Sequence, residues 1–190
     1  GAAVTRQRPG VLWTINDSGN PPDLLLIDTT GTLLATHPLS GVTNTDWEDI
    51  ALGPCPTGRC VYIADTGDNL ERRDAVSLVR LTEPTLDASY RGDRPARTAE
   101  TLTFRYPDGA LDVEAMAVDA AGNALLVSKG RSGGVRLYRV AATAWGKGVA
   151  TAERIDSLAI LPNAGMGRLV TGMALSPDGQ QLMVRTYRDL

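Results

Sequence analysis

Two glutamates, Glu48 and Glu114, stand at matching places in a short pattern that occurs twice in the sequence. The pattern is Asp-Trp-Glu-Asp-Ile-Ala at residues 46–51 and Asp-Val-Glu-Ala-Met-Ala at residues 112–117. A third copy, Val-Thr-Gly-Met-Ala at residues 170–174, carries Thr171 in place of the glutamate. Carboxylate oxygens gathered without Cys or His are hard ligands, which suit Ca²⁺ and, less well, Mg²⁺. The recurrence therefore predicts that both glutamates contact a metal ion.

Further oxygen donors lie in the loops that leave the neighbouring predicted strands. They complete the predicted metal-binding set: Asn16, Asp17, Asp65 and Asp68. Asp and Asn also cap strand ends and pin turns through hydrogen bonds between side chain and backbone. This structural role is the alternative to metal binding for all of these residues.

Three basic residues occupy the equivalent loops of the later repeats. Lys129, Arg185 and Arg188 are predicted at the same rim, where they could bind a phosphate, a carboxylate or an anionic sugar. The alternative is that they neutralise the neighbouring carboxylates. We favour the second role, because surface Arg and Lys need no ligand to explain them.

Several kinds of catalysis are excluded by what the sequence lacks. His37 is the only histidine, and it is predicted to follow an outermost strand, far from the acidic loops. A Ser/His/Asp triad built on Ser18 is therefore excluded. No glycine-rich loop precedes a helix, which excludes dinucleotide and P-loop chemistry.

The elements that position the acidic residues form a repeat. Glu48 and Glu114 are 66 residues apart, and Glu114 and Thr171 are 57 apart. Each copy enters a short apolar strand, reaches a turn rich in Gly and Pro, and continues into a second short strand. Repeats of this length with four short strands are typical of β-propeller blades. The predicted fold is therefore all-β, a β-propeller of four-stranded antiparallel blades, in which the acidic loops converge on one axial opening.

The chain is predicted to be a single domain, residues 1–190, with about three blades. A partial blade at 1–40 lacks its innermost strand, blades follow at 46–107 and 112–162, and a second partial blade occupies 170–190. A long polar connection is expected at 82–98 and a helical turn within 141–147. Because three blades do not close a propeller, we expect a fragment of a five- to seven-bladed propeller, or closure by self-assembly.

Composition narrows the partners and the cellular location. The net charge is −3, without a basic stripe, which argues against nucleic acid. No apolar run approaches the roughly 18 residues that span a bilayer. Cys55 and Cys60 flank a predicted four-residue loop, so we expect a disulfide and an exported protein, extracellular or periplasmic. Two reduced thiols in a cytosolic protein are the alternative.

The chain resembles a mostly uncharacterised family of exported bacterial β-propeller proteins. The resemblance is carried by Trp-Thr-Ile-Asn-Asp-Ser-Gly-Asn at 13–20, Asp-Trp-Glu-Asp-Ile-Ala at 46–51, Ala-Asp-Thr-Gly-Asp-Asn at 64–69, Asp-Val-Glu-Ala-Met at 112–116 and Ser-Pro-Asp-Gly at 176–179. More distantly it is similar to calcium-binding propellers, the gluconolactonase-like and paraoxonase-like lactonases and the β-propeller phytases. That similarity implies an axial Ca²⁺ held by Glu48 and Glu114, with Asn16. The channel histidines of the lactonases have no counterpart here.

Two functional hypotheses follow. The first is an exported binding or scaffold propeller that recognises a small molecule or a cell-surface partner at an acidic, Ca²⁺-binding mouth. The alternative is a Ca²⁺-dependent hydrolase of esters, lactones or phosphoesters, in which the metal polarises the substrate and Glu48 or Asp49 activates water.

Overall fold

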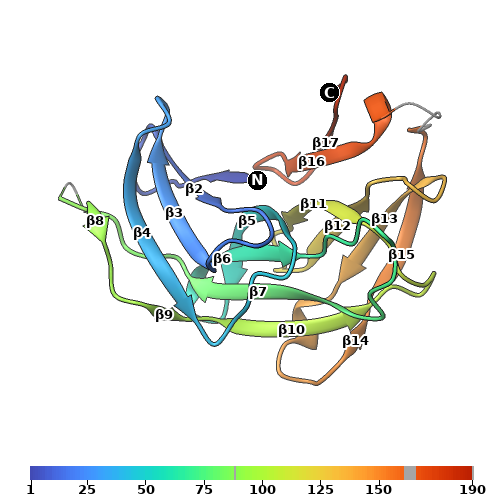
Figure 1. Cartoon of the computed structure of the whole chain (residues 1–190), viewed down its shortest axis with the longest axis horizontal. Helices are drawn as coiled ribbons and strands as arrows, with labels where there is room; N and C mark the ends of the chain where they lie inside the picture. Colours follow the sequence, from blue (N-terminus) through green and yellow to red (C-terminus); the bar gives the residue numbers. More distant parts are fainter. Residues whose placement is uncertain (88, 161–165, 190) are drawn as a thin grey trace.

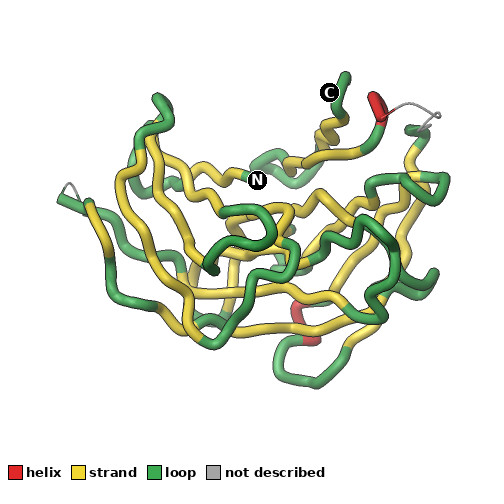
Figure 2. Tube along the Cα trace, in the orientation of Figure 1, coloured by secondary structure: helices red, strands yellow, loops and turns green. Residues whose placement is uncertain are grey.

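The computed structural model describes residues 1–87, 89–160 and 166–189, and it is all-β, as the sequence predicts (Figures 1 and 2). Strands form four separate sheets, none of which closes on itself. The helical turn expected within 141–147 is confirmed as η1 (Ala142–Ala144), and a second 3-10 turn, η2, spans Met166–Arg168. Residues 161–162 and 190, the ends of two predicted blades, lie outside the described residues. Among the described helices, none has the length and apolar character that a membrane span requires.

The four sheets follow one another in chain order (Figure 1). The first sheet contains β1 (Ala2–Val4), β2 (Val11–Ile15), β3 (Asp23–Asp28) and β4 (Leu33–Ser40), extended by β8 (Gly92–Asp93) and β9 (Arg97–Thr98). The second contains β5 (Trp47–Cys55), β6 (Gly58–Asp65), β7 (Val76–Thr82), β10 (Glu100–Arg105) and β14 (Ala150–Thr151). The third contains β11 (Val113–Val118), β12 (Ala124–Ser128), β13 (Val135–Val140) and β15 (Glu153–Leu158), and the fourth β16 (Val170–Leu175) and β17 (Leu182–Thr186).

Two predictions about the first sheet are wrong. A further strand, β1, precedes β2 and pairs antiparallel with it, where the sequence predicts none. A three-residue strand is too short to show a period-two pattern, so the sequence gives no signal for it. His37 does not follow the outermost strand but lies within β4, which is longer than predicted and buries the imidazole beside the Tyr90 hydroxyl.

Short strands in two connections join the second sheet to the first and the third sheet to the second. β8 and β9, from the connection between β7 and β10, pair in parallel with β4 of the first sheet. β14, from the connection between β13 and β15, pairs in parallel with β10 of the second sheet. The predicted polar connection at 82–98 therefore contains sheet structure. Backbone hydrogen bonds thus link neighbouring sheets at their outer edges as well as through the core.

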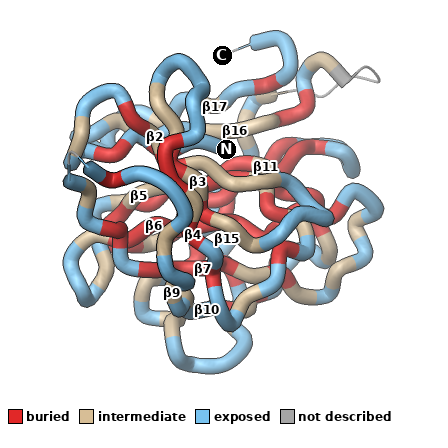
Figure 3. The backbone as a smooth tube through the Cα atoms, turned by 60° about the vertical axis from the view of Figure 1, so that its left-hand side comes forward, coloured by how far each residue is buried: buried red, intermediate tan, exposed pale blue. Residues whose placement is uncertain are grey.

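The core lies between the sheets and is built by alternation along the strands (Figure 3). On β6, Val61 and Ile63 pack toward the first sheet, whereas Tyr62 and Ala64 pack toward the third. Successive strand residues point to opposite faces, so a strand buried on both faces is apolar throughout. A smaller cluster that includes Ala115 and Val170 joins the third sheet to the fourth. Each sheet interior is thus stabilised by its neighbours in sequence.

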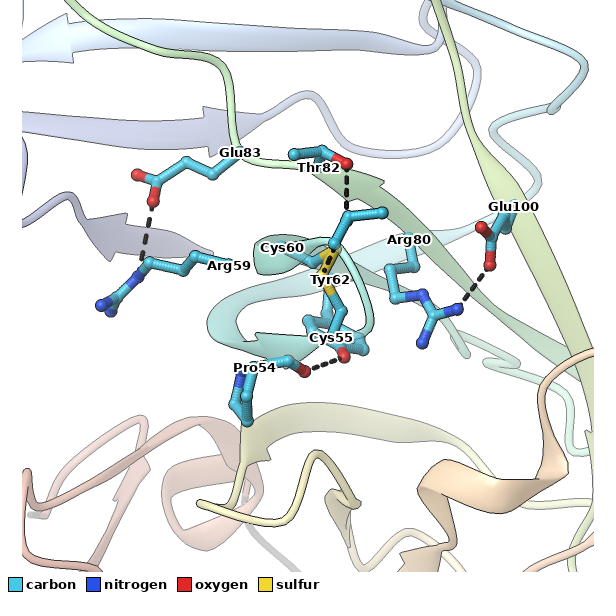
Figure 4. Close-up of a disulfide and its surroundings, with 10 residues drawn as sticks. Pro54, Cys55, Arg59, Cys60, Tyr62, Arg80, Thr82, Glu83 and Glu100 are labelled. Carbon is cyan, nitrogen blue, oxygen red and sulfur yellow. Dashed lines mark hydrogen bonds and ion pairs between the residues drawn. A yellow bond between two sulfur atoms is a disulfide. The ribbon is translucent and has the colours of Figure 1, made fainter.

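The predicted disulfide between Cys55 and Cys60 is confirmed, with the two Cα atoms 5.8 Å apart (Figure 4). The hairpin that carries it is tighter than predicted. β5 extends to Cys55 and β6 begins at Gly58, so two residues form the turn. Gly58 has a φ of 112°, a conformation that favours glycine. A disulfide is compatible with an extracellular location.

Candidate metal centre

A β-bulge lies at the start of β5, β11 and β16, at the three positions that the sequence repeat aligns. The pairing of β5 with β6 skips Glu48, because Trp47 pairs with Asp65 and Asp49 with Ala64. The pairing of β11 with β12 skips Glu114 in the same way, and that of β16 with β17 skips Thr171. A bulge inserts an unpaired residue and turns its side chain away from the regular alternation. The same irregularity thus redirects all three residues that the sequence repeat aligns.

The bulged glutamates meet two aspartates, each of which precedes a glutamate by two residues. Asp112 and Glu114 belong to the third sheet, and they lie around Glu48 of the second sheet. One ligand oxygen from each of these three residues lies within 4.8 Å of the others, and the same holds for Asp17, Asp46 and Glu48. Ca²⁺ binds oxygens at about 2.3–2.6 Å, so ligands on opposite sides of the ion are about 5 Å apart. Each of the two groups is therefore compact enough to surround a metal ion, and Glu48 belongs to both.

The pKa of Glu48 is raised because its carboxyl group is buried among other carboxylates. Burial raises its pKa to about 8, and the negative charges of Glu114, Asp46 and Asp112 contribute in the same direction. Burial likewise raises the pKa of Asp46, with the charge of Asp17 contributing. The metal-free site therefore retains a proton on Glu48 at neutral pH, and a divalent cation would favour its release.

Two cations offset part of this negative charge. Lys129 is buried and forms ion pairs with Glu114 and with Asp112, whose Oδ2 lies 3.6 Å from the ammonium nitrogen. Burial lowers the pKa of Lys129, but the hydrogen bond and charge of Glu114 outweigh it and the net shift is upward. Arg131 donates from Nε to Asp112 Oδ2 at 2.6 Å and from Nη2 to Asn69. Lys129 therefore neutralises neighbouring carboxylates, which is the second of the two roles predicted for the basic residues.

The loop after β6 packs directly against the acidic cluster at Gly67. A Cβ atom on Gly67 would lie 2.3 Å from Glu48 Oε1 and 2.4 Å from Asp46 Oδ2. The Gly67 amide also donates to the Asp46 carbonyl at 3.1 Å. Glycine at this position therefore allows the backbone to approach both carboxylates.

Asp65 ends β6 and Asp68 lies in the loop that follows, and neither joins the groups of acidic residues described above. Asp65 accepts from the amide of Asp46 at 3.2 Å and from Arg73 Nη2 at 2.9 Å. Asp68 Oδ2 accepts from the amides of Arg72 and Arg73 at 2.5 and 2.6 Å. These contacts are the turn and strand-end interactions that the sequence offers as the alternative to metal binding.

Asp49 is buried and links β5 to β11. Its Oδ2 accepts from the Met116 amide of β11 at 2.8 Å, and its Oδ1 accepts from the Ile50 amide at 2.9 Å. Burial raises its pKa to about 6, although both hydrogen bonds oppose the shift. Both oxygens are engaged with backbone groups, so Asp49 is less suited than Glu48 to activating water.

The remaining predicted residues lie around the cluster or apart from it. Asn16 contributes its carbonyl, which accepts from Asn44 Nδ2 at 3.2 Å. Arg185 donates to Thr171, from Nε to the hydroxyl at 3.0 Å and from Nη2 to the carbonyl at 2.9 Å. The side chain of Arg188 lies against Gly167. These contacts place the two arginines beside the fourth sheet.

Asp46 and Asp112 belong to the cluster but not to the predicted metal-binding set. The sequence contains a signal for both, since each repeat reads Asp-x-Glu, with Asp46 before Glu48 and Asp112 before Glu114. An acid that recurs at the same spacing before both glutamates is expected at equivalent places in the two repeats. The spacing could therefore have added the aspartates to the predicted ligands.

Comparison with models of known protein families gives no match to this chain, and comparison with curated protein sequences also gives none.

Proposed function

We propose that the protein is an exported β-propeller that binds Ca²⁺ at its axial mouth and recognises a small molecule or a cell-surface partner there. In this proposal each sheet is one blade, and the innermost strands β1, β5, β11 and β16 surround the axis. Contacts between β1 and β5, between β5 and β11, and between β11 and β16 support this arrangement. The disulfide supports export.

The observation that carries the proposal is the meeting of two bulged glutamates from neighbouring sheets with two aspartates. Four carboxylates lie close together while Lys129 and Arg131 supply two positive charges. A bound Ca²⁺ would balance the excess negative charge and favour loss of the Glu48 proton, so that Glu48 binds the ion as a carboxylate. The ion would bind at Glu48, either with Asp112 and Glu114 or with Asp17 and Asp46, and the rim around them would contact the partner.

The test is a thermal melt of the protein, first in EDTA and then with increasing Ca²⁺. A ligand that binds only the folded state adds about 2.7 kcal/mol at a hundredfold excess over Kd. For a chain of this size the melting temperature should rise by roughly 5–10 °C. Glu48→Gln and Glu114→Gln should abolish the Ca²⁺-dependent rise, whereas Glu153→Gln, which alters an exposed carboxylate on β15, should retain it.

The readout in each variant is the shift caused by Ca²⁺, which separates binding from any change in basal stability. An unchanged melting temperature at millimolar Ca²⁺ in the wild-type protein would contradict the proposal. The acidic loops would then serve turn formation alone. A larger shift with Mg²⁺ than with Ca²⁺ would favour a smaller ion at the same residues.

One observation favours hydrolysis as the second candidate function. Burial and neighbouring negative charges raise the pKa of Glu48, as they do for many general acids and bases, and a Ca²⁺ ion bound nearby would ionise the carboxyl group so that it could act as the base. In that case Ca²⁺ would polarise an ester, lactone or phosphoester, and Glu48 would activate water. Aryl esters, lactones and phosphoesters should be tested with the Ca²⁺-loaded protein. Turnover that falls by about a hundredfold or more in Glu48→Gln would establish the enzyme, and no turnover would favour binding.

A further inference from the structure

A cavity lies between the second and third sheets, at the other end of β5 from the acidic cluster. Its volume is about 550 Å³, within the range of small-molecule sites. The walls include the disulfide hairpin through Pro54 and Cys55 and the segment after η1 through Trp145. Tyr62 adds a second aromatic ring to the lining, and Arg80 and Glu100 add its charged groups.

Two aromatic side chains give the cavity an apolar surface. Tyr62 and Trp145 meet edge to face, with ring centroids 6.1 Å apart and an interplanar angle of 69°. The Tyr62 hydroxyl donates to the Pro54 carbonyl at 2.6 Å, which fixes the ring against the hairpin (Figure 4). Trp145 is only partly buried, whereas Trp13 and Trp47 are fully enclosed in the core. Trp145 is thus the tryptophan available to a ligand.

Arg80 provides a fixed positive charge in the same cavity. Its guanidinium carbon lies 4.0 Å from the centroid of the Trp145 ring, and Nη2 donates to Glu100 Oε2 at 2.5 Å. The Arg80 side chain is 8% exposed, but that of Glu100 is 66% exposed. An exposed carboxylate contributes little to such a pair, because water and salt screen it. The guanidinium carries five N–H donors arranged to match a carboxylate, so another carboxylate can take the place of Glu100.

We propose that this cavity binds a small aromatic carboxylate. The aromatic part would lie against Trp145 and Tyr62, and the carboxylate would bind Arg80 in exchange for Glu100. The disulfide holds one wall in place, since Cys55 is itself part of the lining. The cavity shares no residue with the acidic cluster, so the proposal is independent of Ca²⁺ binding.

The test uses 2-naphthoate as the probe and 2-naphthamide as its uncharged control, each titrated into the whole chain. The indole N–H signal of Trp145, assigned by comparison with Trp145→Phe, reports binding in ¹H–¹⁵N NMR spectra. Naphthoate should shift this signal saturably and leave those of Trp13 and Trp47 in place. Naphthamide should bind at least about tenfold more weakly, because it lacks the charge-assisted hydrogen bonds to Arg80.

Two substitutions should change the affinity in opposite directions. Glu100→Ala removes the competing carboxylate and should tighten naphthoate binding severalfold, while Arg80→Met should weaken it about tenfold or more. Glu153→Ala is the matched control, since Glu153 is equally exposed in its ion pair with Arg139 but lies outside the cavity. It should leave the affinity unchanged.

The proposal is overturned if naphthoate does not bind at about 10 mM, the range of very weak ligands. Equal binding of the acid and the amide, or weaker binding to Glu100→Ala, would also overturn it. These outcomes would leave Arg80 as a residue that only joins two sheets. Circular dichroism checks that Arg80→Met is folded, and if it is not, the amide control and Glu100→Ala decide.

Discussion

At the residue scale, the bulge and the acid are separate features of the repeat. β16 retains the bulge although Thr171 replaces the glutamate there. The irregularity therefore does not require a carboxylate. In β5 and β11 the same backbone feature presents Glu48 and Glu114 instead. We infer that the bulge belongs to the fold and that the two glutamates add chemistry to it, since bulges commonly redirect side chains at functional sites.

Glu48→Gln should stabilise the metal-free protein at high pH. The folded-state pKa of about 8 lies above the ordinary value of 4.5, so the folded state holds a proton that the unfolded state loses. The free energy of unfolding of the wild type should therefore fall as pH rises from about 4.5 to about 8. Glutamine has no proton to lose, and its variant should follow a flatter profile.

Urea denaturation in EDTA at pH 5 and pH 8 measures this difference. From pH 5 to pH 8, the free energy of unfolding of Glu48→Gln should rise relative to that of the wild type. That of Glu153→Gln, at an exposed position on β15, should not. A wild type that becomes more stable than Glu48→Gln as pH rises would show that the glutamate is favoured in its ionised form.

Asp49→Asn should destabilise the protein, because it disturbs the hydrogen bonds through which Asp49 links β5 to β11. The amide can accept one of the two backbone hydrogen bonds, but its NH₂ group would face the other donor. An unsatisfied buried donor costs about 1–3 kcal/mol. Chemical denaturation measures the loss, and Asp178→Asn, in the exposed turn after β16, provides the control. A loss no larger than that of the control would mean that Asp49 does not join the strands.

At the element scale, the strands with clear alternation or apolar runs could be predicted from the sequence. The sequence predicts strands at 11–15, 124–128 and 135–140, and β2, β12 and β13 occupy these residues. The strands predicted at 61–64 and 76–81 are longer in the structure, where β6 and β7 span Gly58–Asp65 and Val76–Thr82. The strands that the sequence missed, β1, β8, β9 and β14, have two or three residues each. Their pairing depends on where the neighbouring sheet lies, and a run this short contains no periodicity that could reveal it.

The residues of the candidate site could likewise be predicted only in part from the sequence. The repeat identified Glu48 and Glu114, which lie together as predicted. It could not separate them from Asp65 and Asp68, because all four precede or follow a strand and all four are acidic. What separates them is the bulge at the glutamates and the set of backbone amides around the aspartates. Both are properties of the folded backbone, which residue types alone do not contain.

Removing the disulfide should destabilise the β5–β6 hairpin and the cavity beside it. A bridge across six residues lowers the entropy of the unfolded chain by an amount equivalent to about 2 kcal/mol. The double variant Cys55→Ser, Cys60→Ser should lose stability of that order in denaturant titrations without reductant. Adding reductant should lower the stability of the wild type to that of the variant and leave the variant unchanged. A wild type that is insensitive to full reduction would contradict this expectation.

At the scale of the whole molecule, each sheet depends on the next. β6 contributes alternate side chains to two different core clusters, so the second sheet cannot separate from the first without exposing Ile63 or from the third without exposing Tyr62. The parallel pairings of β8, β9 and β14 add backbone links between the same neighbours. Interfaces that share a strand should lose their packing together, which predicts one cooperative transition for the first three sheets.

Ile63→Ala tests this coupling. Ile63 is fully buried between the first and second sheets, and its truncation should cost about 2–5 kcal/mol. Ile155→Ala is the matched control, because Ile155 on β15 is 46% exposed and should change stability by less than about 1 kcal/mol. In a Trp145→Phe background, tryptophan fluorescence reports Trp13 and Trp47 in the affected interface, while circular dichroism reports all sheets. In Ile63→Ala the two signals should shift together to lower denaturant, because β6 transmits the loss to the third sheet. Separate transitions would mean that the sheets unfold independently and that the shared strand does not couple them.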